Sequence, residues 1–427
     1  MLLLFLCAGS AWGAGFPRQV DPVDLSEVLS FIKGARIAHI GCFRAQEGQF
    51  EPIPYQIDER TEDGDLIFTK GPEAHPEDAD GRLQLRDDFL ILARDIGERM
   101  DPPSWPDGFI KGVEIQINDP VHHAQGYVYV GVFDRNPPRS TVDYVRYEAQ
   151  ANRIESESYI LGFSKEAPIV FNSLVLKNTM GGNGEDPIDR MKIRLDATLR
   201  GGIELKKTED DYTAKVIGYI DGPIRVIRRT RNRIILFWNI PSPSAIQDNY
   251  FYRDSFIFPI LVSLPFDLDL FFRKASLRIS VDLKSKTLRR FVNEHNRSPV
   301  LIDGKKSAAE AALDKRPYGW SAIYGDNPRS PGGWFNRLSM EDSSITPQLY
   351  YVDEEENDDP PERSAGQIGN IGYQVDDLTK LGGGIHKLTS FMYAFNAFSN
   401  DLVESYIDIE RHPLQATPTR WFHHSSE

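Results

Sequence analysis

The stretches GVEIQIN (Gly112–Asn118) and GYVYVGVFDR (Gly126–Arg135) each alternate between two kinds of side chain, residue by residue. A period of two is typical of a β-strand with one buried face. The second stretch is followed by Asn136 and two prolines, a combination that favours a turn. Together these features predict antiparallel β-structure in this part of the chain.

Further short segments after these two stretches show the same strand character, and they are separated by turns every eight to twelve residues. They are Asp143–Ala149, Arg153–Ile160, Val170–Leu176, Met191–Arg200, Gly202–Lys207, Lys215–Tyr219, Ile224–Arg228, Arg233–Trp238 and Leu277–Leu283. This spacing predicts a mainly β protein, a large antiparallel β-sandwich, and argues against alternating βαβ units.

A few peripheral helices are expected near the two ends of the chain. Asp21–Gly34 places apolar residues on one helical face, between a capping Asp21 and a terminating Gly34. Lys305–Lys315 is rich in good helix formers, and Leu388–Val403 places aromatic residues close to a period of 3.6.

The length of 427 residues is more than one small core requires. We expect a signal peptide over residues 1–13 and an N-terminal part over 14–108 that carries a helix and a hairpin with an acidic loop. A β-sandwich core over 109–290 and a loop-rich C-terminal region with helices over 291–427 complete the expected organisation.

The N-terminus, MLLLFLCAGSAWG, resembles a secretory signal because its apolar segment is too short to span a bilayer and ends in small residues. Removal of residues 1–13 leaves Cys42 as the one remaining cysteine, which excludes an intramolecular disulfide. We expect Cys42 to be a small buried apolar residue. A large secreted chain without a disulfide favours a bacterial periplasmic or extracellular location.

The formal net charge is −14, from 49 basic and 63 acidic residues. Binding to nucleic acid requires a basic surface, so this charge argues against a nucleic-acid partner. An acidic surface is compatible with solubility and with binding of divalent cations.

A candidate calcium loop lies between the strand-like runs Pro54–Glu59 and Asp88–Ala93. When Gly81 takes the sharp-turn position of an EF-hand-type loop, Asp78, Asp80, Gln84 and Asp87 take positions that supply oxygen ligands. The first position falls on Pro76, which has no side-chain oxygen. The alternative is an acidic turn whose aspartates accept hydrogen bonds from their own backbone. A second acidic segment, Asp353–Asp359, is expected to be an exposed, mobile loop.

Arg225 and Arg228 follow the turn Asp221-Gly222-Pro223 in a strand that alternates arginine with aliphatic residues. Two guanidinium groups can bind a carboxylate or a phosphate bidentately, so the pair is a candidate ligand-binding site. The alternative is that both arginines are structural partners of local groups.

The chain carries neither the GxSxG motif of nucleophilic hydrolysis nor the HExxH motif of zinc-dependent hydrolysis. Glu114 and Asp254 are candidate carboxylates for glycoside chemistry, but the sequence does not pair either one with a second acid. The sequence therefore favours a binding protein over an enzyme.

Ser255–Phe272 is the most apolar run after the N-terminus. Pro259, Pro265, Asp267 and Asp269 within it argue against a membrane span. We expect two buried strands joined near Pro265, with peripheral membrane contact through residues 255–272 as the alternative.

Two motifs resemble a family of secreted bacterial proteins of unknown function, which occurs beside or fused to enzymes that degrade pectin-like polysaccharides. The residues that match its motifs are Gln56, Asp58, Asp80, Gly81, Asp88, Gly222, Pro223 and Arg225. The chain departs from the family pattern at Ala79 and at Asp87-Asp88. The resemblance implies a secreted β-sandwich.

The function expected from the sequence is that of a secreted module that binds a glycan or a cell surface, with calcium as the candidate cofactor. A polysaccharide-active enzyme that uses unidentified carboxylates is one alternative, and a membrane-surface accessory protein is the other.

Overall fold

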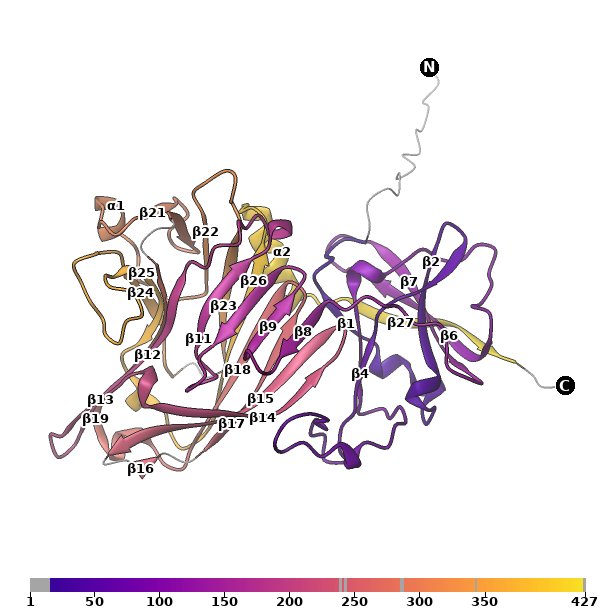
Figure 1. Ribbon diagram of the computed structural model, residues 1–427, viewed down its shortest axis with the longest axis horizontal. Helices are drawn as coiled ribbons and strands as arrows, with labels where there is room; N and C mark the ends of the chain where they lie inside the picture. Colours follow the sequence, from indigo (N-terminus) through magenta and orange to yellow (C-terminus); the bar gives the residue numbers. More distant parts are fainter. Residues whose placement is uncertain (1–15, 238–239, 242–243, 285–287, 342–343, 425–427) are drawn as a thin grey trace, which may run out of the picture. The chain divides into compact units, whose positions relative to one another are not determined.

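The computed structural model describes residues 16–237, 240–241, 244–284, 288–341 and 344–424, so the predicted signal peptide lies outside the described residues. The chain divides into two compact units (Figure 1). Unit 1 comprises residues 1–66, 79–142 and 404–427, and unit 2 comprises residues 67–78 and 143–403. The boundaries expected at residues 108 and 290 fall inside these units.

Unit 1 contains two antiparallel sheets. The three-stranded sheet has the order β1 (Pro22–Asp24), β5 (Asp88–Leu92) and β4 (Gln56–Asp58). The five-stranded sheet has the order β27 (Gln415–His423), β6 (Phe109–Asn118), β7 (Gln125–Phe133), β2 (Ile40–Gln46) and β3 (Gln49–Pro52). The predicted hairpin is confirmed, because β6 and β7 pair from Phe109↔Phe133 to Asn118↔Gln125.

The N-terminal helix expected over Asp21–Gly34 is wrong. This segment forms β1, which pairs with β5, and the single-turn 3₁₀ helices η1 (Ser26–Val28) and η2 (Ser30–Ile32). The apolar residues Leu25, Leu29 and Ile32 of this segment are nevertheless buried, in one core with Cys42. Pairing with β5 satisfies the backbone of β1, so tertiary contacts override the local helical pattern.

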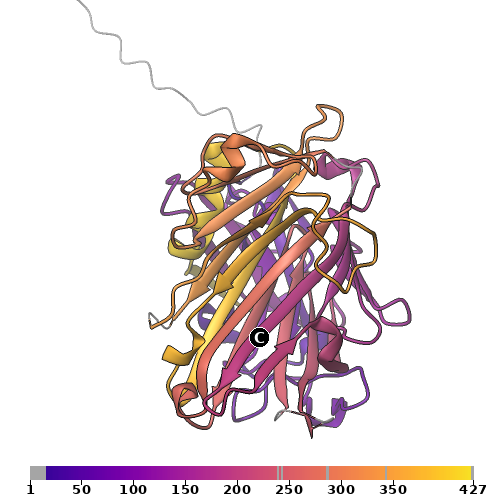
Figure 2. The same cartoon turned by 90° about the vertical axis from the view of Figure 1, so that its left-hand side faces the viewer.

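Unit 2 contains three antiparallel sheets, whose long strands run side by side in Figure 2. The four-stranded sheet has the order β11 (Phe171–Leu176), β10 (Tyr159–Phe163), β9 (Arg153–Ser156) and β8 (Val145–Glu148). The five-stranded sheet has the order β13 (Glu204–Lys207), β12 (Ile188–Leu199), β19 (Phe272–Leu283), β25 (Ile368–Val375) and β24 (Gln348–Val352).

The third sheet of unit 2 has ten strands. Its order is β14 (Tyr212–Asp221), β15 (Arg225–Phe237), β17 (Ala245–Tyr252), β18 (Ser255–Leu264), β26 (Gly384–Phe395), β23 (Gly333–Met340), β22 (Trp320–Gly325), β20 (Arg289–Asn293) and β21 (Val300–Ile302), and β16 (Ile240–Pro241) pairs with β15. One apolar core joins all three sheets, with Leu174, Phe256 and Ile371 among its members. This packing of sheet against sheet confirms the predicted mainly β fold.

Two α-helices occur among the described residues, α1 (Ala308–Ala311) and α2 (Asn400–Arg411). The helix expected over Leu388–Val403 is wrong, because residues up to Phe395 belong to β26 and α2 begins only at Asn400. β26 lies between β18 and β23, and most of its second half is buried on both faces. An apolar run of this kind has the same appearance in a buried strand and in a buried helix.

The apolar run Ser255–Phe272 forms β18, a 3₁₀ turn η8 (Leu268–Leu270) and the first residue of β19. β17 pairs with β18 only as far as Ile257, whereas β26 pairs with β18 to its end. Pro259 therefore lies where β18 has left β17, which is a position at which a strand tolerates a missing N–H. Among the described residues, no helix is long and apolar enough to cross a membrane.

Candidate functional site

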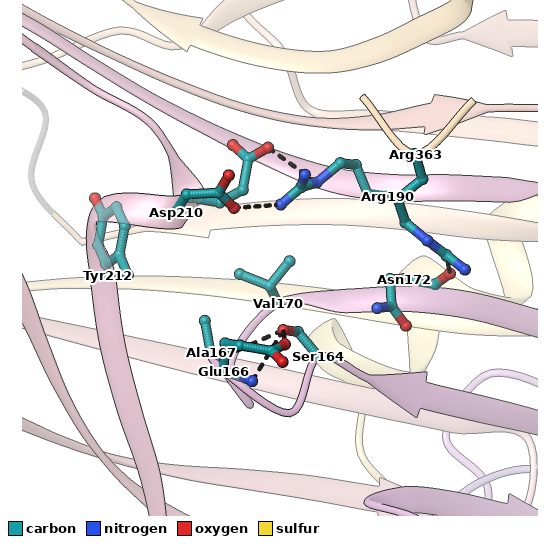
Figure 3. A pocket seen from close by; sticks show the side chains of 10 residues that line it. Ser164, Glu166, Ala167, Val170, Asn172, Arg190, Asp210, Tyr212 and Arg363 are labelled. Atoms are coloured by element: carbon teal, nitrogen blue, oxygen red, sulfur yellow. Dashed lines mark hydrogen bonds and ion pairs between the residues drawn. The ribbon is translucent and has the colours of Figure 1, made fainter. Parts of the chain in front are cut away.

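A polar cavity of about 480 Å³ opens in unit 2 (Figure 3). It is lined by Ser164, Glu166, Ala167, Val170, Asn172, Arg190, Glu209, Asp210, Tyr212 and Arg363. These residues come from the loop between β10 and β11, from β11, β12 and β14, from the 3₁₀ turn η7 (Glu209–Asp211) and from the segment before β25. The volume falls within the range of small-molecule sites.

Arg190 is the central cation of the cavity wall. Its Nε lies 3.0 Å from Oε1 of Glu209, and its Nη2 lies 2.7 Å from Oδ1 of Asp210. Glu209 is buried and also pairs with Arg194. The two acids hold the guanidinium of Arg190 in place, so the wall is preorganised before any ligand enters.

Arg363 supplies a second cation to the same cavity. Its Nη1 donates to the carbonyl oxygens of Asn172, at 2.5 Å, and of Asp189, at 2.8 Å. Both acceptors are neutral, and the side chain is exposed. Arg363 therefore brings a solvent-accessible positive charge to the cavity.

The remaining wall is made of small polar groups and one ring. The Oγ of Ser164 donates to Glu166 at 3.0 Å and accepts the N–H of Ala167 at 3.2 Å, which shapes the loop between β10 and β11. Hydrogen bonds from its own backbone and from Ser164 lower the pKa of Glu166, so this carboxylate is ionised at neutral pH. Burial raises the pKa of Tyr212 well above its usual range, which keeps its hydroxyl protonated.

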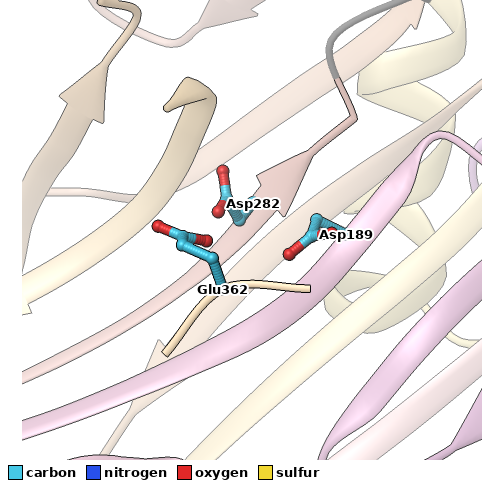
Figure 4. A group of neighbouring side chains, drawn as sticks. All are labelled: Asp189, Asp282 and Glu362. Carbon is cyan, nitrogen blue, oxygen red and sulfur yellow. The ribbon is translucent and has the colours of Figure 1, made fainter. Parts of the chain in front are cut away.

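Three carboxylates form a cluster, those of Asp189, Asp282 and Glu362 (Figure 4). Two of them are sequence neighbours of cavity residues, since Asp189 precedes Arg190 and Glu362 precedes Arg363. One oxygen from each carboxylate lies within 4.8 Å of the other two. The Nζ of Lys192 is 2.9 Å from Oδ2 of Asp282 and 2.6 Å from Oε1 of Glu362. The three acids could hold a metal ion.

A β-bulge brings Asp189 into this cluster. Ile188 pairs with Leu283 and Arg190 pairs with Asp282, so β12 has one residue more than β19 at this point, and that residue is Asp189. A bulge re-aims the side chain of the extra residue. The sequence analysis missed all three acids because they lie on separate strands and segments and share no local motif.

The predicted calcium-loop residues lie elsewhere. Asp78 ends the 3₁₀ turn η4 (Pro76–Asp78) in unit 2, whereas Asp80, Gln84 and Asp87 belong to unit 1. Asp80 accepts the N–H of Arg82 at 2.7 Å and the side-chain N–H of Gln84 at 2.9 Å. These are the hydrogen bonds of the alternative, an acidic turn, and calcium binding by this loop stays a prediction.

Asp87 is the most buried member of the predicted loop. It accepts the N–H groups of Gln84 and Arg60 at 2.7 Å and 3.0 Å. Burial nevertheless raises the pKa of Asp87. Its two oxygens thus connect the acidic turn to the segment that follows β4.

The second acidic segment is anchored at both ends, which corrects the expectation of an exposed, mobile loop. Asp353 is buried and accepts the N–H groups of Asp303 and Gly304. Asp359 forms ion pairs with Arg194 and Arg278. Only the middle of the segment, residues 355–358, is fully exposed.

Arg225 and Arg228 both lie on β15 and are buried. The guanidinium of Arg228 donates to the carbonyl of Pro168 and packs 3.5 Å from the ring centroid of Phe163. Arg225 donates to the hydroxyl of Tyr252 at 3.3 Å. Ligand binding by this pair stays a prediction and would require a ligand to enter the core.

The two carboxylates that were candidates for glycoside chemistry lie in different units. Glu114, in unit 1, is fully buried and pairs with Arg420 at 2.7 Å and Arg99 at 3.1 Å. Asp254, in unit 2, is buried and pairs with Arg253 at 2.6 Å. Each acid therefore has its charge matched within its own unit.

The fold and the cavity define a mainly β protein with a polar pocket. No family model matches the chain, and no curated protein matches its sequence. The resemblance to a secreted family associated with pectin degradation therefore stays a prediction.

Among the solved structures to which the chain is similar are two from Enterococcus faecalis. One is an α-mannosidase from Enterococcus faecalis V583, with 9% sequence identity and a TM-score of 0.41 over 92% of this chain and 48% of that chain. The other is a protein in the glycosyl hydrolase family 38 from Enterococcus faecalis, with 7% identity and a TM-score of 0.41 over 90% of this chain and 42% of that chain. This chain spans less than half the length of either protein. A likeness of this degree identifies no activity, substrate or site.

Proposed function

We propose that the protein is a secreted carbohydrate-binding module, and that the cavity in unit 2 binds an acidic sugar of the uronate type. The observation that carries the proposal is that one cavity holds two arginines: Arg190, which two acids fix in place, and the exposed Arg363, whose hydrogen-bond acceptors are neutral. Arg363 matches the carboxylate of a uronate, because a guanidinium binds a carboxylate bidentately. Glu166, Asp210 and Asn172 are suited to sugar hydroxyl groups, which donate and accept hydrogen bonds.

A direct test compares the wild type with Arg363→Gln by titration calorimetry, using galacturonate oligosaccharides as the ligand. Loss of one charge-assisted hydrogen-bonding group costs about 1.5–3 kcal/mol, so we expect affinity to fall roughly 10- to 150-fold. Arg316→Gln is the matched control, since Arg316 is exposed, pairs with Asp314 and lies outside the cavity. Equal affinity of the wild type for carboxyl-reduced oligosaccharides would contradict the proposal.

The same oligosaccharides serve to separate binding from hydrolysis. Glu166 and Asp210 both line the cavity, and glycosidases use pairs of carboxylates. Binding without release of reducing ends supports a binding module. Release that disappears in Asp210→Asn, but not in the exposed control Asp377→Asn, would assign the alternative function, an enzyme.

A second candidate function is peripheral contact with a lipid surface, in a bacterial periplasmic or extracellular location. It is supported by an apolar tip in unit 2, which we define as the exposed side chains of Ile203, Phe266, Leu270, Phe271 and Ile385. The rings of Phe266 and Phe271 lie 4.4 Å apart, and Arg200 donates its N–H to the carbonyl of Phe271. Exposed apolar side chains, with two rings in contact, are typical of an interaction surface.

Co-sedimentation with vesicles of phosphatidylcholine, with and without phosphatidylserine, tests the membrane function. We expect the double variant Leu270→Ser/Phe271→Ser to bind vesicles at least tenfold more weakly, because each buried apolar side chain contributes about 1.5–3 kcal/mol. Leu288→Ser is the control, since Leu288 is equally exposed in unit 2 and lies outside the tip. A wild type that stays in solution with both kinds of vesicle would exclude membrane contact.

A further inference from the structure

The carboxylate cluster of Asp189, Asp282 and Glu362 has more buried acceptors than donors. Asp189 accepts the N–H of Arg363 at 3.0 Å through Oδ2, and Asp282 accepts from Gln367 at 3.2 Å through Oδ1. Oδ1 of Asp189 and Oε2 of Glu362 are buried without a hydrogen-bond partner among the described residues. A buried, unsatisfied carboxylate oxygen is costly, so two of them in one cluster indicate a missing cation or proton.

Asp189 provides the independent observation that the cluster faces a ligand position. Its side chain is about 2% exposed, and one of its oxygens points toward Asp282 and Glu362 (Figure 4). The bulge in β12 turns this side chain inward instead of leaving it to alternate with its neighbours. At this position one regular residue pair of the sheet is missing, and a carboxylate lies in the interior.

The charges of the cluster are not balanced by Lys192. Its three ammonium protons are directed at Asp282, at Glu362 and at the carbonyl of Asp359, which is 2.7 Å away. The cluster of three carboxylates therefore has one lysine, which contacts two of them.

We propose that Asp189, Asp282 and Glu362 bind one divalent cation, with Ca²⁺ as the preferred ion. The ligand set consists of carboxylate oxygens alone, which favours a hard cation over zinc or copper. Ca²⁺–oxygen distances of about 2.3–2.6 Å place ligand atoms up to roughly 5 Å apart across the ion. The separations within 4.8 Å in this cluster fit that geometry. Lys192 remains beside the ion. Its positive charge offsets the negative charge that the three carboxylates carry in excess of the two positive charges of the ion.

Such an ion would connect three separate parts of unit 2. Asp189 lies on β12, Asp282 lies on β19, and Glu362 lies on the segment before β25. The cation would hold this segment against the sheet and would thereby fix Arg363 beside the cavity. The site itself does not depend on the proposed sugar, so the two proposals can fail separately.

Native mass spectrometry and calorimetry on the chelator-treated full chain test the site, with Ca²⁺, Mg²⁺ and Mn²⁺ as the ions. We expect one Ca²⁺ per chain and a higher melting temperature on its addition. Asp189→Asn is expected to weaken Ca²⁺ binding at least tenfold. Asp196→Asn, an exposed position on the same strand, should leave it unchanged.

A further variant separates this cluster from the predicted acidic loop. Asp80→Ala changes an exposed side chain and is not expected to affect folding. Retention of the ion in Asp80→Ala supports the cluster, whereas loss of the ion in that variant assigns the ion to the loop and overturns the proposal. A wild type that takes up none of the three ions, and whose melting temperature they leave unchanged, overturns it whether or not Asp189→Asn folds. In that case a shared proton explains the cluster.

Discussion

Replacing Lys192 with methionine is expected to lower the free energy of unfolding by about 3–5 kcal/mol, the cost of leaving buried charges without their partner. Lys192 is fully buried, and its ammonium group pairs with Asp282 and Glu362. Methionine preserves the length and most of the volume of the side chain. The expected loss therefore reports the unbalanced carboxylates and not a cavity.

Denaturant unfolding in the presence of a chelator measures this effect without interference from a bound ion. Lys387→Met is the matched control, because Lys387 pairs with Glu341 at 2.9 Å on the surface, where an ion pair contributes about 0–1 kcal/mol. The double variant Lys192→Met/Asp282→Asn should lose less than the sum of the two single variants, since its cluster carries one charge fewer. A loss below about 1 kcal/mol in Lys192→Met would contradict the burial of an uncompensated cluster.

Truncating Arg228 to alanine is expected to lower the free energy of unfolding by about 3–5 kcal/mol, the range for removing a large buried side chain. The guanidinium of Arg228 lies over the ring of Phe163 and donates to Asn152 at 3.2 Å and to the carbonyl of Pro168. Alanine removes this packing and the hydrogen bond to the carbonyl of Pro168, whereas Oδ1 of Asn152 still accepts the hydroxyl of Tyr147 at 2.9 Å. Burial lowers the pKa of Arg228 to about 10, so the side chain remains charged at neutral pH.

Arg228→Met separates the packing of this side chain from its charge. Methionine fills most of the space and removes a desolvated charge, so we expect a loss of less than about 1.5 kcal/mol. Arg231→Ala, on the exposed face of the same strand, is the control for a surface ion pair, since Arg231 pairs with Glu73. If Arg228→Ala were as stable as Arg231→Ala, Arg228 would not be part of the core, and a ligand-binding role would become more plausible.

The strands that alternate with period two were predictable because their pattern is local. The alternation within β6 and within β7 indicates which of their side chains face the core. This inference does not require their partner strands to be known. Leu388–Phe395 was not predictable, because a strand buried on both faces has no alternation to show. This segment forms a strand and not a helix because it pairs with the neighbouring strands β18 and β23.

The candidate calcium loop illustrates the same limit for sites. The sequence predicts Asp78, Asp80 and Asp87 as calcium ligands because they are close in sequence and their spacing resembles that of an EF-hand-type loop. The carboxylates whose oxygens come within 4.8 Å of one another, among the described residues, are Asp189, Asp282 and Glu362. Spacing along the chain is informative only for sites built on one local segment.

The sequence by itself determined the mainly β character of the chain, the burial of Cys42 and the acidic surface, since each of these depends on composition or on local periodicity. Only the tertiary structure decided which acids meet. The register of β12 on β19 and one extra residue, Asp189, bring the cluster together, and the cavity beside it needs segments from several strands. Pairing register depends on all the contacts of a sheet at once, and so it cannot be read from any single stretch of sequence.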